Sequence, residues 1–256
     1  MEALVEGSFY GKSHLSDIER GERRMPLDLA RHVDRVLGTD GFFERHCEHV
    51  RRARRAGHAS YFEHVLEMER RAKSIEEWCP SLFPGLLQTA AYARAVVQAT
   101  HPLALDDEVE PKVSARIARA AIFEEDHHTP SYWVILHESL LVDPILAGRQ
   151  MAEQLDRVVE LTERRRIVPQ ILLRTSGPHP FMVGTAMLLT FADAPPLVYT
   201  ESLHSGVTID DPALVEEYRK SYYRLRAVAL SPEASLARIK AAAEDYRHGE
   251  QPDRPE

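Results

Sequence analysis

The residues best suited to acid–base chemistry follow two short apolar runs in the second half of the chain. His137 and Glu138 come directly after one run, and Glu201 and His204 come after the other. Both runs have the residue types and the length of β-strands, and polar side chains at strand ends often face a pocket. If the two strands end at the same edge of a sheet, a carboxylate and an imidazole converge there as a general acid and a general base. A surface histidine with ordinary hydrogen bonds is the commoner origin of such a pattern.

Two histidines at helical spacing form the most metal-like group. His46 and His49 are three residues apart, so their rings would point to the same side of a helix. A zinc site needs three or four ligands, and only a distant residue such as His64 could add one. A solvated helix face is therefore the better interpretation, and His127 and His128 fit an exposed loop. We expect neither a metal nor an organic cofactor.

The signatures of common enzyme classes are absent from the sequence. The chain contains no Walker loop, no G-x-G-x-x-G after a strand, no G-x-S-x-G elbow and no H-E-x-x-H. A lyase, cyclase or isomerase stays compatible with the sequence, because such an enzyme needs only a shaped cavity and one general acid or base.

The stretch Gly11 to Gly21, GKSHLSDIERG, has the composition of a helix that contacts DNA. Leu15 and Ile18 would bury one face of this helix, and the opposite face is polar. The candidate DNA-binding residues are Lys12, Ser13, His14, Ser16, Arg20 and Arg23. A bland amphipathic surface helix would show the same spacing. The basic run Arg51, Arg52, Arg54 and Arg55 could also contact phosphates, but a solvated helix face explains it slightly better.

Composition and charge indicate a globular protein with unequal halves. Hydrophobic residues make up 44% of the 256 residues, enough to fill a real core. The net charge is −8, with +1 on residues 1–58 and −9 on the remainder, so only the first part would approach a polyanion. Cys47 and Cys79 are too sparse for a disulfide framework. With neither an export signal nor a transmembrane segment, we expect a cytoplasmic protein that does not enter the membrane.

The elements that must position these residues follow from apolar periodicity and turn signals. The predicted helices span 27–37, one or two segments within 42–78, 86–99, 112–123 with a start near 106, 144–165, 212–229 and 232–246, and residues 101–111 are predicted as a loop. Helical spacing places Leu29, Val33, Val36 and Leu37 on one face of the first helix, and Met151, Leu155, Val158 and Leu161 on the inward face of 144–165. We expect Gln88 and Thr89 to cap the helix at 86–99. The predicted strands span 132–136, 169–173, 185–191 and 197–200. This order predicts a predominantly helical α+β fold, in which a short helical region precedes a helical domain with a small β-sheet. The expected domains are 1–57 and 58–246, followed by a disordered tail at 247–256.

Two parts of the chain resemble actinobacterial XRE-type helix-turn-helix regulators. The stretch 11–21 and the helix after it resemble the second half of the helix-turn-helix. PGLLQT at 84–89 with YAR at 92–94 resembles the opening motif of the C-terminal domain of unknown function in these regulators, and 198–201 and 225–231 also fit that domain. The resemblance implies about two further helices ahead of residue 11, and only Met1 to Phe9 precede it here. The resemblance therefore implies a truncated helix-turn-helix remnant, that is, an incomplete DNA-binding domain.

The resemblance implies a dimeric transcriptional regulator whose C-terminal domain senses an unknown small molecule or a small partner protein. In this interpretation Lys12, Ser13, His14 and Ser16 contact the DNA groove, and Arg20 and Arg23 hold phosphates. An alternative is a regulator-derived protein that no longer binds DNA. It would bind a small molecule, or act as a biosynthetic enzyme of the lyase, cyclase or isomerase type. A third possibility is a protein-interaction module, which would expose a broad apolar patch.

Overall fold

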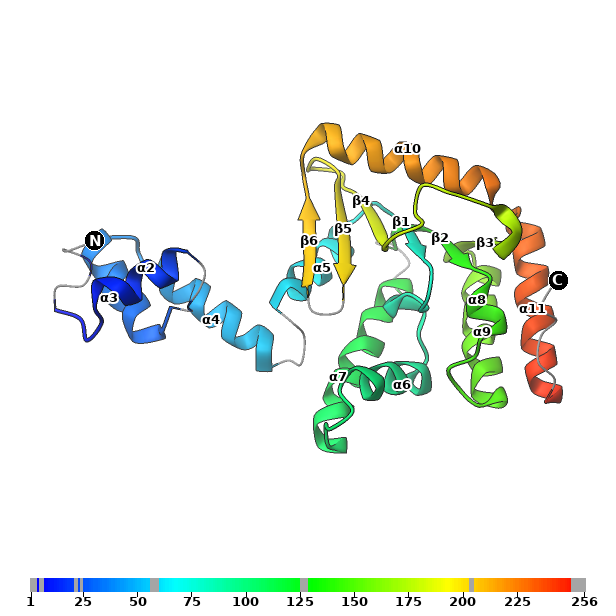
Figure 1. Cartoon of the computed structure of the whole chain (residues 1–256), viewed down its shortest axis with the longest axis horizontal. Helices are drawn as coiled ribbons and strands as arrows, with labels where there is room; N and C mark the ends of the chain where they lie inside the picture. The colour runs from blue at the N-terminus through cyan, green and yellow to red at the C-terminus, as the bar shows by residue number, and fades with distance from the viewer. Residues whose placement is uncertain are drawn as a thin grey trace. The chain divides into compact units, whose positions relative to one another are not determined.

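The computed structural model describes residues 4, 7–20, 23, 25–55, 60–124, 129–202 and 205–249; the side chains of 49–55 and 60–64 lie outside this description. The chain folds as two compact units, Met1–Ser60 and Tyr61–Glu256. Figure 1 shows the elements of both units. None of the helices in the described ranges combines the length and the apolar character needed to cross a bilayer.

The first unit contains the helices α2 (Lys12–Glu19), α3 (Leu27–Leu37) and α4 (Phe42–Arg55). Leu15 is buried in α2, as its spacing predicts, and Leu29 and Val33 are buried in α3. The prediction that Val36 and Leu37 share the buried face of α3 is wrong, because these side chains are 42% and 51% exposed.

Asp34 takes the inward position on α3 instead. Its carboxylate accepts hydrogen bonds from the backbone N–H groups of Phe43 at 3.0 Å and Glu44 at 2.8 Å, so it caps the first turn of α4. Burial opposes ionisation of Asp34, but a hydrogen bond from the Thr39 hydroxyl and these two backbone bonds prevail and lower its pKa. A capping requirement thus outweighs apolar periodicity at this position.

The second unit is built on one six-stranded mixed sheet with the order β3-β2-β1-β4-β5-β6. Its strands are β1 (Ser74–Cys79), β2 (Ser131–His137), β3 (Ile167–Leu172), β4 (Ala186–Thr190), β5 (Leu197–Ser202) and β6 (Ser205–Ile209). β1, β2 and β3 are parallel, and the other neighbouring pairs are antiparallel. The predicted class, predominantly helical α+β, is confirmed.

Helices cover both faces of this sheet (Figure 1). The helices of the unit are α5 (Ser60–Arg71), α6 (Ala90–Thr100), α7 (Asp106–Arg119), α8 (Ser139–Val142), α9 (Gly148–Glu163), α10 (Pro212–Val228) and α11 (Pro232–His248), with short 3-10 turns at 85–87, 120–123 and 174–176. The larger core packs α5, α6, α9 and α11 on one face, and the smaller core packs α10 on the other. Below, these are called the large-core face and the α10 face. The inward residues predicted for α9, Met151, Leu155, Val158 and Leu161, are all buried.

Two predicted elements differ from the structure. Residues 74–78 were predicted to be helical because they contain no helix breaker, but they belong to β1, which pairs with β2 and β4. Residues 101–111 were predicted as a loop in which the next helix starts near 106; the start at Asp106 is confirmed, and the difference is that Pro111 lies inside α7 rather than at its boundary. In addition, β6 was not predicted, and it forms a hairpin with β5.

Candidate functional site

The residues of the PGLLQT motif pack in the core of the second unit and cap a helix. Leu86 and Leu87 are buried in the large core, and the Thr89 hydroxyl caps α6 by accepting from the backbone N–H of Tyr92 at 3.3 Å. Gln88 does not cap the helix as predicted; its amide donates to the carbonyl of Phe83 at 2.7 Å. Gln154 links the motif to α9, because its side chain donates a hydrogen bond to the Leu87 carbonyl and accepts one from the Thr89 N–H.

Gly85 of the motif makes room for a buried ion pair. Arg119 donates to Glu69 at 3.2 and 2.5 Å, and the two side chains are only 8% and 2% exposed. A β-carbon at residue 85 would lie 2.6 Å from Nη1 of Arg119, closer than any ordinary contact. Burial opposes the charge on Arg119, but Glu69 prevails and raises its pKa. The absence of a side chain at Gly85 therefore leaves space for the guanidinium group of Arg119 beside the motif.

A second buried carboxylate lies near this pair on the large-core face. Glu77 accepts hydrogen bonds from the hydroxyl of Tyr132 and from the Cys79 thiol. Burial raises the pKa of Glu77 to about 7, although the Tyr132 bond opposes this. Burial also raises the pKa values of Tyr132 and Cys79 well above their ordinary values. A carboxyl group that titrates near neutrality can act as an acid or a base, but here its neighbours enclose it.

The predicted acid–base residues after β2 have different environments. Glu138 is completely buried, forms an ion pair with Arg238 of α11, and accepts from the backbone N–H of Arg174 at 3.0 Å. It thereby joins the end of β2 to the end of β3 and to α11. His137 is half-buried, and its Nδ1 lies 2.8 Å from the Ser139 hydroxyl. Burial lowers the pKa of His137, so the neutral ring is favoured.

Glu201 does not meet His137. The strands β2 and β5 run in the same direction, so both residues lie at the same edge of the sheet, which was the condition for their convergence. Two strands separate them, which corresponds to about 14 Å at the usual spacing. The alternation of side chains also places His137 on the α10 face, against Trp78, and Glu201 on the large-core face, where the charges of Arg116 and Arg119 act on its carboxylate. His204 lies outside the described residues.

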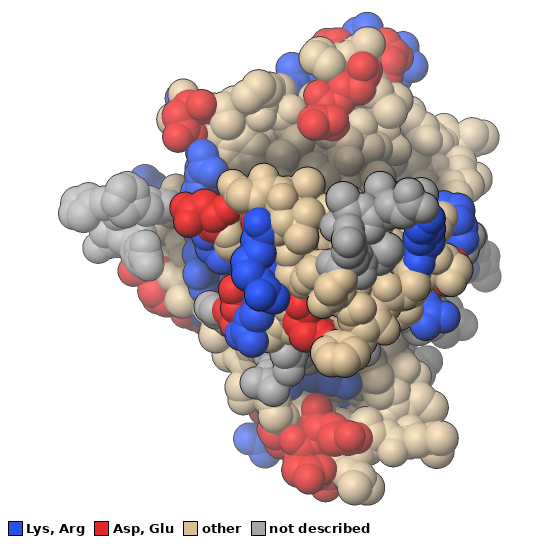
Figure 2. Space-filling view, turned by 90° about the vertical axis from the view of Figure 1, so that its left-hand side faces the viewer, with Lys and Arg blue, Asp and Glu red and all other residues tan. Residues whose placement is uncertain are grey.

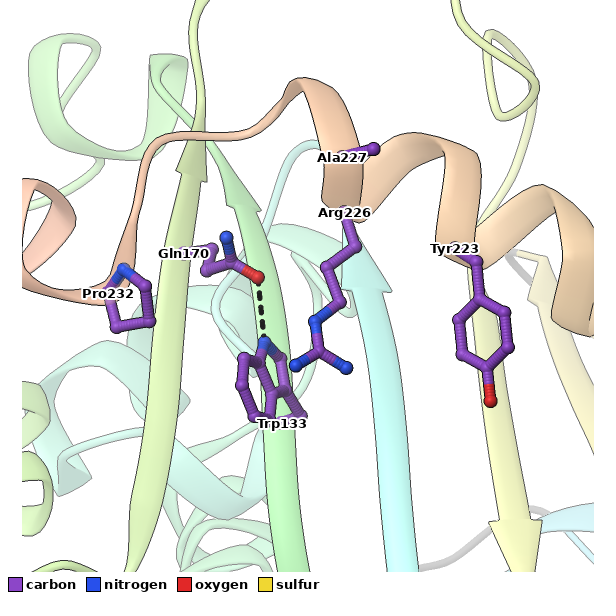
Figure 3. Close-up of a pocket in the computed structure, with 6 residues that line it drawn as sticks. All are labelled: Trp133, Gln170, Tyr223, Arg226, Ala227 and Pro232. Carbon is purple, nitrogen blue, oxygen red and sulfur yellow. Dashed lines mark hydrogen bonds between the residues drawn. The ribbon is translucent and has the colours of Figure 1, made fainter.

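An open groove lies on the α10 face, with a volume of about 470 Å³. It is lined by Trp133 of β2, Gln170 of β3, Tyr223, Arg226 and Ala227 of α10, and Pro232 of α11 (Figure 3). Trp133 donates its indole N–H to the Gln170 side-chain oxygen at 2.8 Å, and Gln170 in turn donates to the Leu230 carbonyl at 2.6 Å. These bonds fix the floor of the groove.

Arg226 covers this floor with its guanidinium group. Its Cζ lies 3.3 Å from the centroid of the Trp133 ring, a cation–π contact, and Nη1 lies 4.0 Å from the Glu76 carboxylate. No described group accepts a hydrogen bond from Arg226, although a guanidinium offers five N–H donors. Arg226 was not among the predicted site residues; its only sequence signal is its place in the segment 225–231, which fits the C-terminal domain.

The candidate DNA-binding side chains lie on or beside α2. Lys12, Ser13, Arg20 and Arg23 are exposed, and Ser16 and His14 are half-buried. Arg20 donates to the Ser16 hydroxyl and to Asp17, and Arg23 approaches both Asp17 and His14. The two arginines expected to hold phosphates therefore share one carboxylate. On the face drawn in Figure 2, Lys and Arg side chains lie among Asp and Glu side chains and neutral surface.

The remaining predicted polar groups have few described contacts. In the described ranges, no three His, Cys, Asp or Glu residues lie close enough together to hold a metal ion. The His46 ring stacks on Phe42, and both cysteines are free thiols. The side chains of His49 and His64, and those of Arg51, Arg52, Arg54 and Arg55, lie outside the description, as do His127 and His128.

The second unit is thus a helix-covered mixed sheet with a buried polar cluster on one face and an open, arginine-covered groove on the other. Residues 62–241 match the family described as a domain of unknown function (DUF5753). This match spans most of the chain, which therefore belongs to that family, and it includes the PGLLQT motif. No curated protein and no solved structure matches the chain.

Proposed function

We propose that this protein is a DNA-binding transcriptional regulator of the XRE type whose DUF5753 domain binds a small molecule or a partner protein. The observation that carries the DNA-binding part is the division of α2 into two faces. Leu15 is buried beneath the helix, and Lys12 and Ser13 are exposed in its first turn. That turn contains no acidic residue, so the positive end of the helix dipole is left for a phosphate.

A homodimer would supply the paired geometry that such a short helix needs. Two copies of α2, related by a two-fold axis, would contact two half-sites about one helical turn of DNA apart. The charge distribution supports this arrangement only for the first part of the chain, because the rest carries −9. We therefore assign DNA contact to the first unit and ligand binding to the second.

The test is binding of the full chain to a duplex from its own promoter region, with a scrambled duplex as control and salt as the variable. Lys12→Gln should weaken specific binding and reduce the slope of log affinity against log salt by about 1, as expected for one lost phosphate contact. Arg35→Gln is the matched control, since Arg35 is exposed on α3 and loses the same charge. Equal affinity for both duplexes, or equal loss in the two variants, would refute the proposal.

A catalytic function at the predicted acid–base residues receives less support from the geometry. Glu138 is buried in an ion pair with Arg238, and Glu201 and His137 lie on opposite faces of the sheet. The groove belongs to the α10 face and is lined by none of these residues. Binding is therefore a better proposal for the second unit than acid–base catalysis.

A further inference from the structure

We infer that the groove on the α10 face binds a small planar aromatic carboxylate, with its carboxylate on Arg226 and its ring against Trp133, Ala227 and Pro232. This inference rests on the ligand-binding part of the proposed function and names the ligand class. A volume of about 470 Å³ lies in the range of small-molecule sites. The hydrogen bonds already made by the groove, the charge around it and its preorganisation all favour this ligand class.

Most polar groups of the groove floor are already used within the protein. The Trp133 N–H and one N–H of the Gln170 amide are donated internally, and the Gln170 oxygen already accepts one bond, so these groups offer a ligand little beyond one neutral amide N–H. The charged donors without a described acceptor belong to Arg226, because the carboxylate paired with it, Glu76, lies at 4.0 Å, beyond hydrogen-bond distance. Apart from the Tyr223 hydroxyl, the remaining lining surface is apolar or aromatic. A ligand that fits this lining has one anionic group and a flat apolar body.

The surrounding charge favours a monoanion. The groove has one arginine, Glu76 lies beside that arginine, and residues 59–256 carry a net charge of −9. A phosphate dianion would meet more repulsion than a carboxylate and would lack a second cation. A carboxylate also matches the planar fork of a guanidinium, which can donate two parallel hydrogen bonds.

The arginine is held in place before any ligand binds. Stacking on Trp133 fixes the plane of the guanidinium, and the Trp133–Gln170–Leu230 chain of hydrogen bonds fixes Trp133 (Figure 3). Tyr222 adds a further bond from its hydroxyl to the Trp133 carbonyl at 3.2 Å. A preorganised donor loses little conformational entropy on binding. The exposed ring of Tyr223 completes one side of the groove.

The test uses the full chain labelled with 5-fluorotryptophan, because the protein contains only two tryptophans. Trp133 reports on the groove, and Trp78, which is 1% exposed, is the internal reference. Titration with benzoate should shift the Trp133 fluorine resonance saturably, and benzamide and acetate should not reproduce the shift at equal concentration. Arg226→Gln should weaken benzoate binding by about tenfold or more. Arg224→Gln, which removes an exposed arginine from the same helix, should leave it unchanged.

Each other outcome overturns the inference. No saturable shift at Trp133, or equal weakening by both arginine substitutions, removes the site. Equal shifts with acetate and benzoate leave an anion site without aromatic selectivity, and equal shifts with benzamide remove the role of the carboxylate. Arg226→Lys keeps the charge and should also weaken binding, so it serves if Arg226→Gln does not fold. Promoter binding is measured separately, so a failed benzoate titration leaves the DNA-binding proposal standing, and the reverse also holds.

Discussion

Breaking the buried pair of Arg119 and Glu69 should destabilise the second unit far more than breaking an exposed pair. Arg119→Met removes one partner of an ion pair whose side chains are 8% and 2% exposed. A buried carboxylate left without its partner costs about 3–5 kcal/mol. The penalty should lie toward the upper end of that range, because Arg119 also offsets the charges of Glu77 and Glu201.

The matched control is Arg94→Met in the same unit. Arg94 forms two hydrogen bonds with Glu110, at 2.7 and 2.8 Å, but the two side chains are 40% and 50% exposed. Solvent screening limits such a pair to about 0–1 kcal/mol. The two substitutions change charge and volume in the same way, so the predicted difference of at least about 2 kcal/mol isolates the effect of burial.

Urea unfolding followed by tryptophan fluorescence measures this difference, since Trp78 and Trp133 both lie in the second unit. At an m-value of about 2 kcal/mol/M, Arg119→Met should lower the midpoint by roughly 2 M, and Arg94→Met by less than about 0.5 M. Adding Glu69→Gln to Arg119→Met should recover part of the loss, because no buried charge of that pair then remains. Equal shifts for the two single variants would refute the reasoning.

Three further predictions concern the same region. Since burial raises the pKa of Glu77 to about 7 from 4.5, its stabilising protonated form is fully present below pH 4.5 and is lost as the pH rises through 7. Glu77→Gln should thus gain stability over the wild type by up to about 1.4 kcal/mol per pH unit in that window, and a pH-independent difference in urea midpoints would contradict this. Gly85→Ala should cost about 1–3 kcal/mol by displacing Arg119, and clearly less when Arg119→Met is already present. Thr89→Ala should cost about 1 kcal/mol through loss of the α6 cap, and an unchanged thermal midpoint would exclude that role.

Elements with a strong periodic pattern could be predicted from the sequence. The helix α9 shows the apolar spacing of Met151, Leu155, Val158 and Leu161, and α10 and α11 begin with proline after a capping residue. In these segments local propensity and tertiary packing favour the same structure. The strands β2, β4 and β5 were found for the same reason, because each is an apolar run bounded by turn residues.

β1 could not be predicted in this way. Its sequence SIEEWC contains two adjacent glutamates and no alternation of apolar and polar residues, and it becomes a strand because β2 and β4 pair with it on both sides. The groove has a similar origin, since Trp133, Gln170 and Arg226 come from three separate elements. The pair of Arg119 and Glu69 joins residues 50 positions apart. Such sites depend on long-range pairing, which leaves no local pattern in the sequence.

The adjacent glutamates of β1 relate the two faces of the sheet to each other. Because side chains alternate along a strand, Glu77 faces the buried cluster with Arg119, and Glu76 faces Arg226 beside the groove. Burial raises the pKa of Glu76, while Arg226 and Arg219 oppose that shift, so the charge of Arg226 already favours an ionised neighbour.

Glu76 interacts with Arg226 through charge alone, because the 4.0 Å between Nη1 of Arg226 and the Glu76 carboxylate is too long for a hydrogen bond. A ligand carboxylate could therefore take the hydrogen-bond donors of Arg226 without displacing Glu76, and the cost of binding would be its repulsion from Glu76, which the charges of Arg226 and Arg219 partly offset. This geometry favours a singly charged ligand and requires the apolar lining of the groove to supply much of the affinity.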